Sequence, residues 1–91
     1  MIRLLLTDAH APTRAVLRIG LGAAARMEIV GETGSSNELL AQLAAAAPTI
    51  VLLDLSLGPP GPAALALLPA LREQYPRLRV LLRARFITSS T

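Results

Sequence analysis

The sequence contains no cysteine, no tryptophan and no lysine, and it has only one tyrosine and one phenylalanine. Without cysteine the chain can form neither a disulfide nor a thiolate metal site, which fits a reducing, cytoplasmic setting. Without lysine every basic residue is an arginine, and the arginines form no run despite the net charge of +3. A direct nucleic-acid-binding surface is therefore not expected.

Long apolar segments of the kind that cross membranes are also lacking. The stretch 50–71 is apolar, but Asp54 and the cluster Gly58-Pro59-Pro60-Gly61-Pro62 interrupt it, and such a backbone could not satisfy its polar groups in lipid. At the start of the chain, Asp8 comes too early for a secretory signal. With 91 residues, 53% of them hydrophobic, the chain is expected to form one small globular domain with no contact to a membrane.

What the sequence does contain is an alternation of apolar runs and helix-like segments. Val16, Leu17 and Leu21 are spaced for one helix face, and Ser35 with Glu38 has the spacing of a capping box. The alternation predicts an α/β fold with a parallel sheet and helices on both faces. Strands are expected at about 2–7, 27–31, 49–54 and 78–82, and helices at about 12–25, 35–48 and 62–75.

Two aspartates follow two of the expected strands. Asp54 directly follows the apolar run Ile50–Leu53, and Asp8 lies just beyond the apolar run that begins at Ile2. Parallel strands place their carboxyl ends at one edge of the sheet, where open α/β sheets carry their ligands and chemistry. Because an unpartnered buried carboxylate is costly, a group should face Asp54, and Asp8 is the candidate. The two acids predict one acidic site at this edge.

Three stretches, Ile2–His10, Met27–Glu32 and Ile50–Leu57, resemble the receiver domain of bacterial two-component response regulators, especially their transcription-factor branch. The resemblance implies a flavodoxin-like parallel sheet with helices on both faces, lacking the final strand and helix of that fold. It also implies a C-terminally truncated receiver domain over residues 1–84, followed by a polar tail over residues 85–91.

For function, the resemblance implies phosphorelay signal transduction. Asp54 would accept a phosphoryl group from a histidine kinase, a phosphotransfer protein or a small phosphodonor, and the change in conformation would be passed to a partner. A Mg²⁺ ion would neutralise the charge of the incoming group, held by Asp8, Asp54 and the main-chain carbonyl of Ser56. The chain has no catalytic nucleophile–base pair and no glycine-rich phosphate loop, so an independent enzyme is not expected, beyond self-phosphorylation from small donors.

The sequence departs from the receiver pattern at several positions. Ala9 stands where the second acid of the metal-binding pair is usual, and Arg83 lies near the position of the hydroxyl residue that senses phosphate. The lysine that clamps the phosphoryl group is missing. These losses predict weak or degenerate activity, with Mg²⁺ bound weakly or no longer bound. Two interpretations of Arg83 stay open: it pairs with phosphate, or it marks the loss of the sensor.

Alternatives remain for the whole chain and for single residues. The chain could be a phosphorylation-independent interaction module that self-associates through the exposed edge of its fourth strand, or a fragment without autonomous function. Asp54 could be a solvated or capping carboxylate at a strand end, and Asp8 could cap the following helix. His10 is expected at a helix start, and Arg14 and Arg18 on a solvated helix face, with partner docking as the alternative.

Overall fold

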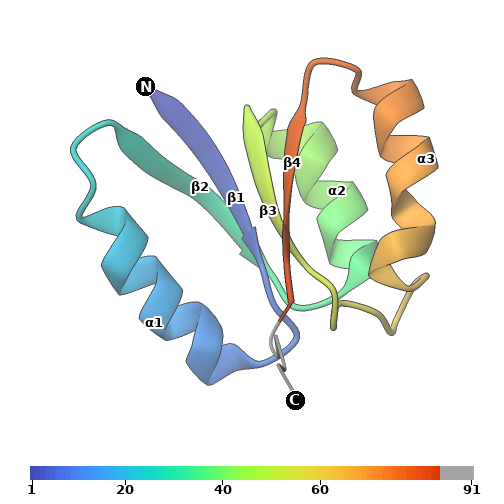
Figure 1. Cartoon of the computed structure of the whole chain (residues 1–91), viewed down its shortest axis with the longest axis horizontal. Coiled ribbons are helices and arrows are strands. Elements are labelled where there is room, and N and C mark those ends of the chain that lie inside the picture. Colours follow the sequence, from blue (N-terminus) through green and yellow to red (C-terminus); the bar gives the residue numbers. More distant parts are fainter. Residues whose placement is uncertain (85–91) are drawn as a thin grey trace, which may run out of the picture.

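The computed structural model describes residues 1–84, and the predicted polar tail at 85–91 lies outside them. The described chain alternates strands and helices in the predicted order (Figure 1). No helix within it is long and apolar enough to cross a membrane. The elements are β1 (Ile2–Thr7), α1 (Ala11–Gly22), β2 (Met27–Thr33), α2 (Ser36–Ala46), β3 (Ile50–Asp54), α3 (Ala64–Gln74) and β4 (Arg79–Arg83).

The four strands form one sheet in the order β2-β1-β3-β4, and every neighbouring pair is parallel. This confirms the predicted α/β architecture. Strand β2 continues to Thr33, two residues beyond the predicted Gly31, because the end of β1 also pairs with it: Thr7 lies opposite Thr33. The pairing shifts register after Leu4. Between β3 and β4, Asp54 lies opposite Arg83.

The helices cover the two faces of the sheet unequally. Helix α1 lies on one face, and α2 and α3 lie on the other (Figure 1). The main core lies beneath α2 and α3, where alternate residues of the central strands meet apolar residues of the helices and of the loop before α3. This core contains Leu5, Leu39, Leu43, Val51, Leu53, Leu57, Ala64, Leu67 and Leu71.

Helix α1 is packed more loosely than its sequence pattern predicts. It has no fully buried residue, and Leu17 and Leu21 are only half-buried. The prediction that Val16 joins them on the packed face is wrong, because its side chain is 70% exposed. The helix rests against β1 and β2, so a stripe of one or two residues per turn suffices for its contact.

The helix starts follow the local sequence. His10 caps α1, with its ring Nδ1 accepting from the Thr13 N–H, so the predicted helix-start role of His10 is confirmed. Ser35 caps α2 and accepts from the Glu38 N–H. The Glu38 side chain returns to the Gly34 N–H, one residue before the cap that a capping box would use.

The loop that follows Asp54 is fastened to the start of α2. The N–H of Ser36 donates to the carbonyl of Gly58 at 3.0 Å, and the N–H of Asn37 donates to the carbonyl of Pro60 at 3.1 Å. Gly61 has a φ of +122°, and a Cβ there would meet the Asn37 backbone nitrogen at 2.8 Å. The loop therefore supplies acceptors for two backbone donors that begin a helix and have no partner within it.

Candidate functional site

The two aspartates lie together at the carboxyl edge of the central strands. Asp54 is the last residue of β3, and Asp8 directly follows the neighbouring β1. Both are fully buried, with 0% of either residue exposed. The interpretation of Asp54 as a solvated carboxylate is therefore wrong, and the predicted pairing of the two acids at one edge agrees with the structure.

One oxygen of Asp54 is held by the loop that follows it. The Ser56 N–H donates to Asp54 Oδ1 at 2.7 Å, and the Ser56 hydroxyl donates to the same oxygen at 2.5 Å. This is the turn in which an aspartate side chain bonds the backbone two residues on. The sequence alone predicts only a main-chain carbonyl role for Ser56, and this side-chain role appears only in the structure. An aspartate followed two positions later by a hydroxyl residue was the available signal.

The second oxygen of each carboxylate meets the same nitrogen of Arg83. Arg83 Nη1 donates to Asp54 Oδ2 at 2.5 Å and to Asp8 Oδ2 at 2.8 Å. The side chain of Arg83 is 28% exposed, whereas the two carboxylates have no exposed area. The strand register fixes this contact, because Arg83 lies opposite Asp54. A guanidinium thus bridges the predicted phosphoacceptor and its neighbour.

These contacts set the charge state of Asp54. Burial raises the pKa of the Asp54 carboxyl, but the hydrogen bonds from the side chain and backbone of Ser56 and the charge and hydrogen bond of Arg83 lower it. The net result is a pKa below the usual aspartate value. Asp54 is therefore a carboxylate at neutral pH, the form that can act as a nucleophile.

Asp8 is held by the chain that enters α1. Its Oδ1 accepts from the His10 N–H at 2.8 Å, and its main-chain carbonyl accepts from Arg14 Nη1 at 2.6 Å. The alternative in which Asp8 caps α1 is wrong, since His10 is the cap. The placing of Arg14 on a solvated face is also wrong. Its Nε lies 3.7 Å from the half-buried Glu32, which Arg18 contacts at 2.8 Å from a more exposed position.

Thr7 joins the two strands just below the carboxylates, a role that is not among those predicted from the sequence. Its buried hydroxyl accepts from the Asp54 N–H at 3.1 Å and donates to the Leu52 carbonyl at 2.7 Å. This side chain fills a gap in the backbone pairing of β1 with β3, whose last matched pair is Leu6 with Leu52. The residue before a site aspartate was the signal that could have drawn attention to it.

A divalent cation does not fit these residues as they lie. Each of the four carboxylate oxygens of Asp8 and Asp54 already accepts at least one hydrogen bond, from His10, Ser56 or Arg83. A guanidinium is bonded to both carboxylates where a metal would bind. Ala9 supplies no third carboxylate, and residues 1–84 contain no group of three or more histidine, cysteine or acidic side chains arranged to hold a metal.

Comparison with known proteins finds similarity only among solved structures. No family model matches the sequence, and no curated protein matches it. The isolated receiver domain of RcsB from Salmonella enterica serovar Typhimurium superposes with a TM-score of 0.86 at 19% identity, over 96% of this chain and 64% of that one. The non-phosphorylated receiver domain of RcsB from Escherichia coli gives 0.86 at 19% identity, over 96% and 67%.

The response regulator domain of CheB from Thermotoga maritima is similar to the same extent, with a TM-score of 0.84 and 21% identity over 100% of this chain and 66% of that domain. This chain thus spans about two thirds of the isolated receiver domains, and 45% of RcsB in its complex with the promoter rprA. The sheet order, the helix placement and these superpositions agree. Residues 1–84 have the fold of a response-regulator receiver domain, without the final strand and helix of that fold.

Proposed function

We propose that this chain acts as a receiver domain in phosphorelay signal transduction, with Asp54 as a weakly active phosphoacceptor. The observation that carries the proposal is the buried, ionised carboxylate of Asp54 beside Asp8, at the edge of a receiver-like sheet where ligands approach. A histidine kinase, a phosphotransfer protein or a small phosphodonor would supply the phosphoryl group.

The reaction requires a nucleophile and a positive charge beside the incoming phosphoryl group, which is itself negatively charged. A carboxylate oxygen of Asp54 gives its electron pair to phosphorus, while the bond from phosphorus to the donor's oxygen or nitrogen breaks. That atom leaves with the bonding pair: an acyl phosphate releases a carboxylate, whereas a nitrogen leaving group takes a proton from solvent. Arg83, partly exposed and already bonded to Asp54, is placed to turn toward the phosphoryl oxygens.

Weak activity follows from the same contacts. Both oxygens of Asp54 accept hydrogen bonds before any donor arrives, from Ser56 on one side and Arg83 on the other. Attack by either oxygen removes its negative charge and so weakens the hydrogen bonds that it accepts. Charge-assisted bonds of this kind are worth about 1.5–3 kcal/mol, so the reactant state is stabilised and phosphorylation slowed.

Intact mass spectrometry of the full chain tests the proposal, after incubation with acetyl phosphate or phosphoramidate in the presence of Mg²⁺ or of EDTA. We expect a single phosphoryl adduct on a minor fraction of wild-type chains and none on Asp54→Asn. Far-UV circular dichroism must show that both proteins are folded. A folded wild-type chain without adduct, or an adduct that persists in Asp54→Asn, would overturn the proposal.

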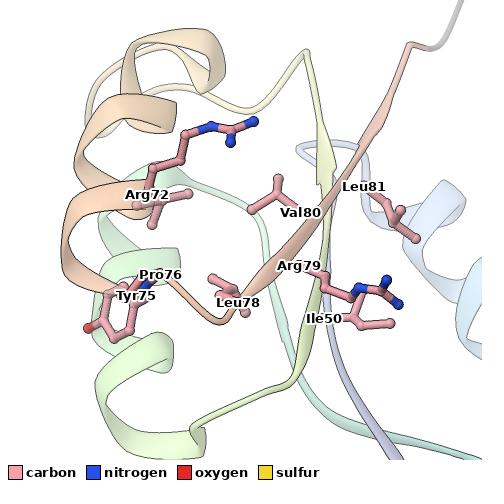
Figure 2. A pocket seen from close by; sticks show the side chains of 9 residues that line it. Ile50, Arg72, Tyr75, Pro76, Leu78, Arg79, Val80 and Leu81 are labelled. Carbon is pink, nitrogen blue, oxygen red and sulfur yellow. The ribbon is translucent and has the colours of Figure 1, made fainter.

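A second candidate function is a phosphorylation-independent interaction module that pairs with a second copy through β4. Within residues 1–84, β4 pairs only with β3, and its Leu81 and Leu82 are 53% and 50% exposed. Beside the strand lies a groove of about 660 Å³, lined mainly by apolar residues of β3, α3, β4 and the α3–β4 connection, together with Arg72 and Arg79 (Figure 2). An exposed apolar edge of this kind favours strand pairing.

Self-association through β4 is testable by sedimentation over a range of protein concentrations. In an antiparallel pair centred on Leu81, the Leu81→Arg variant would place two introduced arginines directly opposite each other. We expect this variant to associate about tenfold more weakly than wild type. Val16→Arg, at an exposed position on α1, is the matched control and should leave association unchanged. A wild-type chain that stays monomeric throughout would exclude this candidate.

A further inference from the structure

We infer that Arg83 serves as a built-in cation that takes the place of a divalent metal between Asp8 and Asp54. Under this inference, which extends the proposed function, the positive charge of the site comes from the chain itself. The folded state and any phosphorylation of Asp54 are then independent of Mg²⁺.

The position of Arg83 supports this assignment. A single nitrogen, Nη1, lies within 2.8 Å of Asp8 Oδ2 and 2.5 Å of Asp54 Oδ2, so the guanidinium sits where one cation contacts both acids. The pairing of Asp54 with Arg83 across β3 and β4 places the side chain on the same face as the carboxylates. The charge is therefore fixed by the sheet and does not depend on a flexible loop.

Arg83 occupies the place between the two acids that a second cation would need. Mg²⁺ requires near-octahedral oxygen coordination, but Arg83 holds the facing oxygens of both acids, and the other two accept from His10 and Ser56. A metal would have to displace the guanidinium or lie beside it. A divalent ion beside the guanidinium would be repelled by its positive charge at close range.

The net charge of the site explains why phosphorylation of Asp54 would be slow even though it needs no metal. Two carboxylates and one guanidinium leave a net charge of −1, whereas two carboxylates with a divalent ion would be neutral. An incoming phosphoryl group therefore meets residual negative charge. Arg83 can orient the phosphoryl group and neutralise part of its charge, but it carries less positive charge than a divalent ion.

The test is Mn²⁺ binding, followed by the relaxation of water protons, on the wild-type chain and on Arg83→Ala and Asp54→Asn. We expect no saturable site in wild type. Arg83→Ala should show a saturable Mn²⁺ site with an affinity at least about tenfold above the upper limit set by wild type, because the competing charge is gone. Its melting temperature should rise by about 4–8 °C on adding Mg²⁺, while that of wild type stays within about 1 °C.

Saturable Mn²⁺ binding by wild type that Asp54→Asn abolishes would overturn the inference, even if Arg83→Ala fails to fold. A folded Arg83→Ala that gains no affinity would also overturn it. The result is separate from the proposed function. An adduct that forms only in the presence of Mg²⁺ would contradict this inference but leave Asp54 as the phosphoacceptor. A wild-type chain that binds no Mn²⁺ and also forms no adduct would contradict the proposed function alone.

Discussion

Replacing Arg83 by methionine is expected to lower the free energy of unfolding by about 3–5 kcal/mol, the range observed when one partner of a buried ion pair is removed. The reason is that Asp8 and Asp54 have no exposed area and share Arg83 Nη1. Methionine preserves most of the volume but leaves two neighbouring carboxylates without that cation. Small domains are stable by only about 5–15 kcal/mol in total, so the loss is large.

Urea denaturation at neutral pH measures the effect, with two comparison variants. Arg83→Lys keeps the charge and should recover part of the loss, although its ammonium cannot reproduce the fork of the guanidinium. Arg72→Met changes an exposed arginine that has no ion pair within residues 1–84, and it should shift stability by no more than about 0.5 kcal/mol. If Arg83→Met were as stable as Arg72→Met, the bridge would contribute nothing to folding.

Replacing Leu53 by alanine is expected to lower the free energy of unfolding by about 2–5 kcal/mol. Leu53 has no exposed area and packs in the core beneath α2 and α3, one residue before Asp54. Truncation leaves a cavity that the sheet cannot close, because β3 is paired on both sides. The same truncation at Leu55, just after Asp54 and 38% exposed, is the matched control.

Urea melts of the two alanine variants give the comparison directly. Leu55→Ala should lose less, about 1 kcal/mol, because part of the Leu55 side chain stays in water and its truncation leaves no enclosed cavity. If Leu53→Ala and Leu55→Ala lowered the free energy of unfolding equally, Leu53 would not be tightly packed in the core beneath α2 and α3.

The sequence carried enough information to predict the fold and the meeting of the two acids. Apolar runs that end in aspartate mark buried parallel strands, and the carboxyl ends of adjacent parallel strands share an edge. Asp8 and Asp54 could therefore be placed together without any structure. The strand ends were less predictable, as at β2, where pairing with β1 extends the strand to Thr33 beyond the local apolar pattern.

The bridge by Arg83 could not be predicted, because it depends on register. A shift of one residue between β3 and β4 would turn the side chain to the opposite face of the sheet, and the sequence near Leu81 and Leu82 permits either pairing. The exposure of Val16 was hidden for a related reason. Helical spacing shows which residues share a face, but not how much of that face another element covers.

Two backbone hydrogen bonds join the loop after Asp54 to the start of α2, so the loop and the end of that helix are expected to move together. Moving the loop far enough to break its two carbonyl contacts would leave the amides of Ser36 and Asn37 without acceptors, at about 1–3 kcal/mol each where they stay buried. Rearrangement at Asp54 is thus steered toward shifting loop and helix together. A change at Asp54 that moves the loop would therefore also displace the N-terminal end of α2, and a partner that contacts this helix would detect the change.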